Sequence, residues 1–425
     1  MARDGGAVDI RRIAREDGRL DLAGAPEGFD ALIMADIARA RGGLTAFIAR
    51  DGGRAQAFVG AMGFFAPEIE ILQFPSWDCL PYDRIGPSPA VSAQRMATLA
   101  RLTGRFDPKK PVLLVTAALA AVQRVPDRTV IARASFDARP GQDVDIKALE
   151  DYFAVNGYAR ASTVSEKGEF AIRGGVIDVF PPGAEEPVRL DLFGDTLESI
   201  RAFDPETQRS TKQLKDVALL PVSEALLDAD TIARFRKGYV EAFGNPGDDA
   251  LYAAVSAGSR RAGLEHWLPL LYPRMATLFD YLPEGALVGV DHLAAEARDE
   301  RLAMIEDAYE ARAAADKKSA YKPLAPKALY LDAGEWEARV GERPSRHFTP
   351  FQSDAASAVD MGARLGRTFV AERQQDSVNL FEATAEHATA LAGAGKRVLF
   401  ASWSEGASER LGLMLADHGL TRVPL

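Results

Sequence analysis

The segment GAPEGFDA contains glycines just before a helical pattern, where a phosphate-binding loop would be expected. A working loop follows G-x-x-x-x-G-K-[ST]: backbone N–H groups wrap the phosphates, the lysine neutralises them and the hydroxyl holds magnesium. Gly24 and Gly28 belong to this segment, but Phe29 stands in place of the second glycine of the motif. Asp30 replaces the lysine and Ala31 the hydroxyl, and a carboxylate at the lysine position repels a triphosphate. We therefore interpret the segment as a degenerate nucleotide loop, and favour an ordinary loop and helix start over a nucleotide site.

No other segment supplies the groups that a common reaction needs. No D-E-x-[HD] acidic pair follows an expected strand, so magnesium-assisted activation of water has no candidate residue. The five histidines do not pair at i, i+4 spacing and do not lie near the single cysteine, Cys79, so we expect no metal site. No G-x-S-x-G motif supports a serine nucleophile. We predict no catalytic residue, and Cys79 as a packed residue rather than a reactive thiol.

A second candidate site lies on the expected strand PVRLDLFGD. A period of two puts its valine and leucines on one face and Arg189, Asp191 and Phe193 on the other. An arginine and an aromatic exposed together on a rigid strand are typical of a protein-binding hot spot. Nearby, Arg173 precedes a glycine pair that can bend or bulge its strand. The pattern leaves an alternative open, in which Phe193 folds back over a hydrophobic edge and Arg189 pairs with Asp191 or Glu198.

The elements that carry these residues change pattern twice along the chain. The first third alternates helices with short apolar strands, which predicts a parallel sheet covered on both faces. From 169 to 203 strands and turns alternate without helices, so we expect a small antiparallel unit. A buried strand at 286–290 is expected to complete the first sheet. After Pro344, strands at 368–372 and 397–401 and helices at 378–394 and 407–418 predict a separate small α/β domain. The strands expected in the first third are 44–49, 69–74 and 111–116, and the helices are 31–41, 54–64 and 87–102.

We therefore predict an α/β multidomain chain. A parallel-sheet domain, similar to a degenerate RecA or P-loop domain, comprises residues 1–135 and 222–345. A small α+β antiparallel domain, residues 136–221, is inserted between these two parts. Residues 346–425 form the small α/β domain at the end.

Composition narrows the class of protein. The chain has 425 residues, of which 47% are hydrophobic and 26% charged, as in ordinary globular proteins. The net charge of −10 favours a protein or small-molecule partner over DNA, because tight non-specific DNA binding needs clustered cations. A single cysteine indicates a reducing compartment. No stretch approaches the roughly 20 apolar residues of a membrane span, so we expect a cytoplasmic protein with no membrane partner.

Three segments resemble bacterial transcription-repair coupling factors, which share part of their sequence with the repair helicase UvrB. These segments are 74–102, 168–210 and 263–273, and the second is the most specific. The resemblance covers most of residues 20–345, and residues 346–425 match only by position and pattern. It implies that 1–135 is a UvrB-like domain 1A, 136–221 domain 2, 222–345 domain 1B and 346–425 domain 3.

The resemblance also implies partners. Coupling factors are ATP-driven translocases that remove stalled RNA polymerase and recruit the excision machinery. ATP and magnesium would be used by a C-terminal motor that this sequence lacks, and no cofactor is expected here. RNA polymerase and DNA would bind other parts of the full-length coupling factor, called here the parent. Leu425 is expected to be a boundary within this parent rather than its natural end. Domain 2 would bind the UvrA ATPase through Arg173, Arg189 and Phe193, a surface that the parent's C-terminal domains are thought to cover.

Two alternatives stay open. The chain could be a self-inhibitory structural module that clamps the C-terminal part of the parent. It could also be a residual DNA-binding, helicase-like domain driven by nucleotide, although the missing lysine and acidic pair speak against that.

Overall fold

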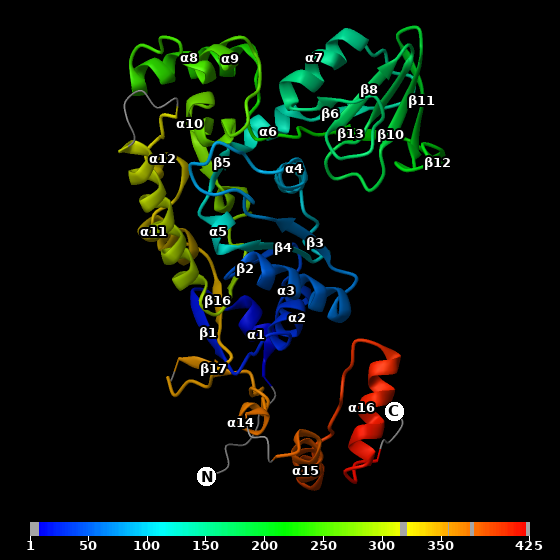
Figure 1. The fold of residues 1–425 in the computed structure, drawn as a ribbon, viewed down its shortest axis with the longest axis vertical. Helices are drawn as coiled ribbons and strands as arrows, with labels where there is room; N and C mark the ends of the chain where they lie inside the picture. The colour runs from blue at the N-terminus through cyan, green and yellow to red at the C-terminus, as the bar shows by residue number, and fades with distance from the viewer. Residues whose placement is uncertain (1–7, 315–320, 356, 375–377, 422–425) are drawn as a thin grey trace. The chain divides into compact units, whose positions relative to one another are not determined.

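The computed structural model describes residues 8–314, 321–355, 357–374 and 378–421 (Figure 1). The chain divides into two compact units, Met1–Arg364 and Leu365–Leu425.

The centre of the first unit is a parallel sheet of seven strands. Its order is β17-β1-β16-β15-β2-β4-β3, and every neighbouring pair is parallel. Every residue of β2 and β4 is buried, as expected for strands that are covered on both faces. The strands are β1 (Arg19–Ala23), β2 (Leu44–Ala49), β3 (Glu70–Phe74), β4 (Val112–Ala117), β15 (Val288–Val290), β16 (Ser345–Phe348) and β17 (Ala358–Asp360).

Helices cover both faces of this sheet, so the prediction of a covered parallel sheet is confirmed. On one face, residues of α1, α2 and α3 join a core that includes Phe47 and Phe58, whose rings stack at 3.8 Å. On the other face, α4 and the helix-rich segment after residue 222 join the larger core around Ile48 and Leu114. The helices are α1 (Ile10–Arg15), α2 (Phe29–Arg41), α3 (Gly52–Phe65), α4 (Pro89–Thr103), α5 (Ala118–Ala121) and α6 (Arg128–Ala134).

The predicted inserted unit is a six-stranded sheet covered by one long helix. Its order is β12-β11-β10-β9-β8-β7, antiparallel except between β7 and β8. Helix α7 contributes Leu149 and Phe153 to the core beneath the sheet. The elements are β6 (Phe136–Ala138), α7 (Ile146–Asn156), β7 (Ala159–Arg160), β8 (Glu169–Arg173), β9 (Val176–Val179), β10 (Val188–Phe193), β11 (Thr196–Phe203), β12 (Ser210–Leu214) and β13 (Val217–Leu219), where β6 pairs with β13.

The chain then returns to the first sheet. Strand β15 lies between β16 and β2, which confirms that the segment 286–290 completes the sheet. A short pair, β14 (Met275–Thr277) with β5 (Arg124–Pro126), joins this region to the first third. The helices are α8 (Ala229–Phe243), α9 (Ala250–Ser256), the 3-10 turns η1 (Leu264–Trp267) and η2 (Leu278–Tyr281), α10 (Leu268–Leu271), α11 (Ala294–Ala313), α12 (Pro326–Leu329) and α13 (Ala333–Gly341).

Two predictions about the end of the chain need correction. The boundary at 345/346 falls inside β16, and the first unit continues through β17 to Arg364, because β16 and β17 both pair with β1. The second unit contains α14 (Val370–Arg373), α15 (Leu380–Gly393) and α16 (Glu405–Ala416), so the two long helices are confirmed. The strand expected at 368–372 overlaps α14, and 397–401 is not a strand, so the described part of this unit is helical rather than α/β. Among the described residues, no helix is long and apolar enough to cross a membrane.

Candidate functional site

The degenerate loop lies between β1 and α2, where a phosphate-binding loop would lie. Gly24 and Gly28 have φ angles of 62° and 89°, which favour glycine. The amide of Gly24 donates to the carbonyl of Phe351 at 2.8 Å. A Cβ on Gly24 would lie 2.7 Å from the carbonyl oxygen of Ala363. This glycine therefore allows close packing against the chain that follows β16.

The carboxylate of Asp30 occupies the amino end of α2. Its Oδ1 accepts hydrogen bonds from the amides of Gly28, at 3.0 Å, and Ala31, at 2.7 Å. The amino end of a helix presents unsatisfied N–H groups and a positive partial charge, which bind phosphate in a working loop. Phe29 opens the helix, and Asp30 is only 1% exposed. The residue that replaces the lysine thus supplies an anion to the loop from within the chain.

A buried arginine balances this carboxylate. Arg54 of α3 is 4% exposed, and its Nη2 is ion-paired with Asp30 Oδ2. Asp291, which follows β15, lies 3.5 Å from Arg54 Nε and 3.5 Å from Arg50 Nη1. Burial, together with Asp291, outweighs the attraction of Arg54 and raises the pKa of Asp30 to about 6. Glu27 of the loop also pairs with Arg50 at 2.8 Å. The loop is therefore held by an internal network of carboxylates around two arginines.

The second candidate site lies on the outer face of the inserted sheet. Val188 and Leu190 of β10 are buried, and Phe193 is 77% exposed at the end of the strand. The strand alternation predicted from the sequence is therefore confirmed, and the alternative in which Phe193 folds back over an edge is wrong. The amide of Leu192 donates to Gly175 at 2.7 Å, which ties the end of β10 to the turn that follows Arg173.

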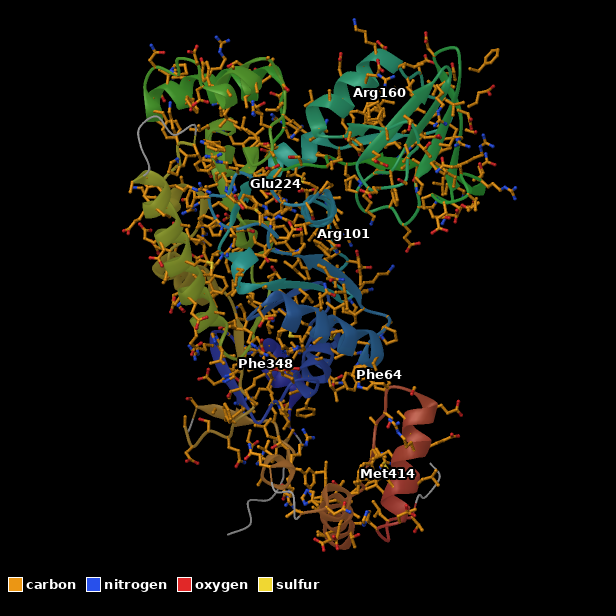
Figure 2. The ribbon with its side chains drawn as sticks, viewed as in Figure 1. Phe64, Arg101, Arg160, Glu224, Phe348 and Met414 are labelled. Carbon is orange, nitrogen blue, oxygen red and sulfur yellow. The ribbon has the colours of Figure 1, made fainter. Side chains whose placement is uncertain are left out.

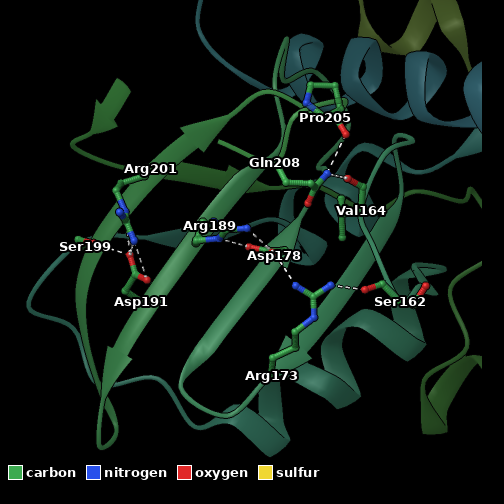
Figure 3. A network of polar contacts seen from close by, with 10 residues as sticks. All are labelled: Ser162, Val164, Arg173, Asp178, Arg189, Asp191, Ser199, Arg201, Pro205 and Gln208. Carbon is green, nitrogen blue, oxygen red and sulfur yellow. Dashed lines mark hydrogen bonds and ion pairs between the residues drawn. The ribbon is translucent and has the colours of Figure 1, made fainter. Parts of the chain in front are cut away.

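Arg189 and Arg173 meet at one buried carboxylate (Figure 3). Asp178 of β9, 2% exposed, accepts from Arg189 Nε at 2.6 Å and Nη2 at 2.9 Å. This hydrogen bonding raises the pKa of Arg189. The Arg189 guanidinium also lies 4.9 Å from the ring centroid of Phe203. Arg173 Nη1 lies 3.7 Å from Asp178, and its Nη2 donates to the carbonyl of Ser162.

The alternative, in which Arg189 pairs with Asp191 or Glu198, is therefore also wrong in the partner of Arg189. Asp191 accepts from Arg201 and Ser199 on β11 instead, and Glu198 is not the partner of Arg189. Sequence reasoning missed Asp178, Arg201 and Gln208. The signal for Asp178 was an acidic residue inside the apolar strand VIDV.

Titratable residues do not gather into a metal site in the described part of the chain. No group of three or more histidine, cysteine, aspartate or glutamate side chains there is placed to hold an ion.

Comparisons with known proteins give one family match, which covers the inserted sheet. The family described as UvrB interaction domain matches residues 136–224. A transcription-repair-coupling factor of Haemophilus influenzae is 32% identical over 323 residues, which cover 75% of this chain and 27% of that protein. The Escherichia coli K12 protein of the same description is 31% identical over 260 residues, covering 61% and 22%. The Bacillus subtilis 168 protein is 28% identical over 239 residues, covering 52% and 20%. The chain thus spans only about a quarter of the length of the first two relatives.

Proposed function

Because this chain belongs to the family of transcription-repair coupling factors, as their N-terminal UvrB-like region, we propose that it recruits the damage-recognition ATPase UvrA. It would do so at stalled transcription sites in nucleotide excision repair. The observation that carries the proposal is Phe193, which is 77% exposed on the domain that matches the UvrB interaction family.

The chemistry of the surface supports a protein partner. A large aromatic side chain on a rigid strand can enter an apolar recess and lose little conformational entropy. Arginine offers charged donors in a planar fork that matches carboxylates. Arg173 has 54% of its side chain exposed, whereas Arg189 has 19% and lies between Asp178 and the Phe203 ring.

The same proposal gives this region no ATPase of its own. This part of the proposal is supported by Asp30, which accepts from two amides of the loop and is ion-paired with Arg54, and by Ala31, which has no hydroxyl for magnesium. ATP, magnesium, RNA polymerase and DNA would be bound by other parts of the parent translocase. The parent's C-terminal domains would compete with UvrA for the surface around Phe193, which makes self-inhibition compatible with recruitment.

Calorimetric titration of the chain with purified UvrA tests the recruitment role. We expect Arg189→Ala combined with Phe193→Ala to weaken binding about 100-fold, since two central contacts of about 1.4 kcal/mol each are lost. Phe64→Ala is the matched control, because Phe64 is 80% exposed on α3, outside the inserted domain (Figure 2). If the double variant binds UvrA as tightly as the unsubstituted chain does, the site is wrong. If the unsubstituted chain does not bind UvrA, the proposed function is wrong.

A further inference from the structure

We infer that the binding surface extends across β10 to Arg201 on β11, and that Asp178 is the positioning residue that organises it for an acidic protein partner. This inference rests on the proposed function, and it adds two residues that the resemblance does not supply. The surface, called here the arginine face, comprises Arg173, Arg189 and Arg201 with their partners Asp178 and Asp191.

The register of the sheet places like charges side by side. Arg189 is directly opposite Arg201 across the β10–β11 pair. Like charges directly opposite in an antiparallel pair destabilise a sheet. The arrangement is tolerated because each arginine has its own carboxylate, Asp178 for Arg189 and Asp191 for Arg201. A sheet that needed only stability could avoid this crowding, so the arrangement indicates a function for the cations.

Both ion pairs use the same edge of the arginine, its Nε and Nη2. Asp178 accepts hydrogen bonds from Nε and Nη2 of Arg189. Asp191 Oδ2 accepts from Nε of Arg201 at 3.0 Å and from its Nη2 at 2.8 Å. A planar guanidinium held along this edge keeps Nη1 on the side away from the carboxylate. Each arginine therefore retains donors for a partner while its orientation is fixed.

Asp178 connects three strands of the arginine face. It lies on β9, directly opposite Arg189 of β10 and Ala171 of β8, and within 3.7 Å of Arg173. Its side chain is 2% exposed, whereas that of Arg173 is 54% exposed. A buried carboxylate that binds two arginines from different strands sets the spacing between their guanidinium groups. Asp178 itself is too buried to contact a partner.

A second contact fixes the edge of the arginine face (Figure 3). The Arg173 guanidinium donates to the carbonyl of Ser162, and Gln208 Nε2 donates to the carbonyl of Val164 at 3.0 Å. The loop that contains Ser162 and Val164 is thus held from both sides. Arg173 therefore has a defined position although more than half of its side chain is exposed.

The charge of the arginine face selects the chemistry of its partner. Three guanidinium groups stand against two carboxylates, and both carboxylates are already bound by arginine. The exposed donors fit aspartate and glutamate side chains, and Phe193 at the end of β10 fits an apolar recess among them. We commit to an acidic protein surface as the occupant, which under the proposed function belongs to UvrA.

Substitution of Arg201 tests the extent of the surface. In UvrA titrations of the full chain, we expect Arg201→Ala to lower the affinity about tenfold. This factor corresponds to a loss of about 1.4 kcal/mol of binding free energy. The matched control is Arg101→Ala, since Arg101 of α4 is similarly exposed and makes the same two-pronged pair, with Glu70 (Figure 2). If Phe193→Ala weakens binding but Arg201→Ala behaves as Arg101→Ala does, the extension to β11 is wrong and the proposed function stands.

A double-mutant cycle tests the positioning role of Asp178. We expect Asp178→Asn to weaken UvrA binding about tenfold in the otherwise unsubstituted chain. The same substitution should have much less effect in the Arg189→Ala background, because the carboxylate acts through that arginine. A general loss of structure would instead weaken both backgrounds equally, and that result would refute the positioning role. Asp178→Glu, which keeps the charge, should restore part of the affinity.

Discussion

The carboxylate of Asp30 is predicted to be a structural ligand of the loop, and Asp30→Ala is the perturbation that tests this. The substitution removes the acceptor for the Gly28 and Ala31 amides and the closest counter-ion of Arg54. Arg54, which is 4% exposed, would then be a buried cation whose remaining carboxylate neighbour, Asp291, lies 3.5 Å away.

The magnitude follows from what remains around Arg54. Removing one partner of a buried ion pair costs about 3–5 kcal/mol, because the other charge stays buried. Asp291 still lies 3.5 Å from Arg54 Nε, so part of the charge remains compensated. We therefore expect a loss of about 3 kcal/mol in the free energy of unfolding, at the lower end of that range. Unfolding entropy is about 2.1 cal/mol/K per residue, so for the unit Met1–Arg364 this loss corresponds to a fall of about 4 °C in the unfolding midpoint.

Thermal unfolding of the parent chain and the variant at pH 7.5, followed by circular dichroism, measures this difference. Asp36→Ala is the control on the same helix, because the side chain of Asp36 is 43% exposed and pairs with Arg39 at the surface. Such a surface pair contributes about 0–1 kcal/mol, so the control should shift the midpoint little. If Asp30→Ala shifts the midpoint no more than Asp36→Ala does, the carboxylate is not the ligand that holds the loop.

Two further predictions concern protons and nucleotide. Burial lowers the pKa of His266 to about 4, below its unfolded value of about 6.5, so this group's stabilisation is present above pH 6.5 and is lost as pH falls toward 4. His266→Phe should make the unfolding midpoint depend less on pH across this window, and an unchanged pH dependence would contradict the assignment. ATP with magnesium should neither be hydrolysed by the chain nor raise its unfolding midpoint, in the absence or presence of DNA. DNA-stimulated phosphate release by the purified chain would show that the loop is functional.

The regular elements of the first unit were predictable because their apolar patterns are long. The strand at 44–49 and the helix 87–102 were found within two residues at each end. Strands β1, β16 and β17 were missed, because segments of three to five residues such as RLDLA carry charges and little period. The helical segment at 370–373 shows the limit again, since four residues cannot distinguish a strand from a helix.

The candidate sites were predictable only as far as a single strand or loop specifies them. The alternation in β10 correctly predicted that Phe193 is exposed and that Arg189 lies on the face opposite to Val188 and Leu190. The partner of Arg189 depends on strand register, and Asp178 lies on the neighbouring strand, which no pattern within β10 could indicate. Likewise, Asp30 was recognised as unfavourable for phosphate, but Arg54 lies 24 residues away in sequence. Its pairing with Asp30 requires the packing of α2 against α3.

The position of β1 has a consequence for how the chain is made. The two neighbours of β1 in the sheet are β16 and β17, which lie within residues 345–360. During synthesis from the amino end, β1 therefore remains without a hydrogen-bonded neighbour until more than 300 further residues have been added. Contacts so distant in sequence form slowly, and an unpaired strand edge is prone to wrong association. A ribosome-bound chain that ends at residue 340 would still have the loop and α2 on an unsupported strand, so this unit completes its sheet only when it is almost fully synthesised.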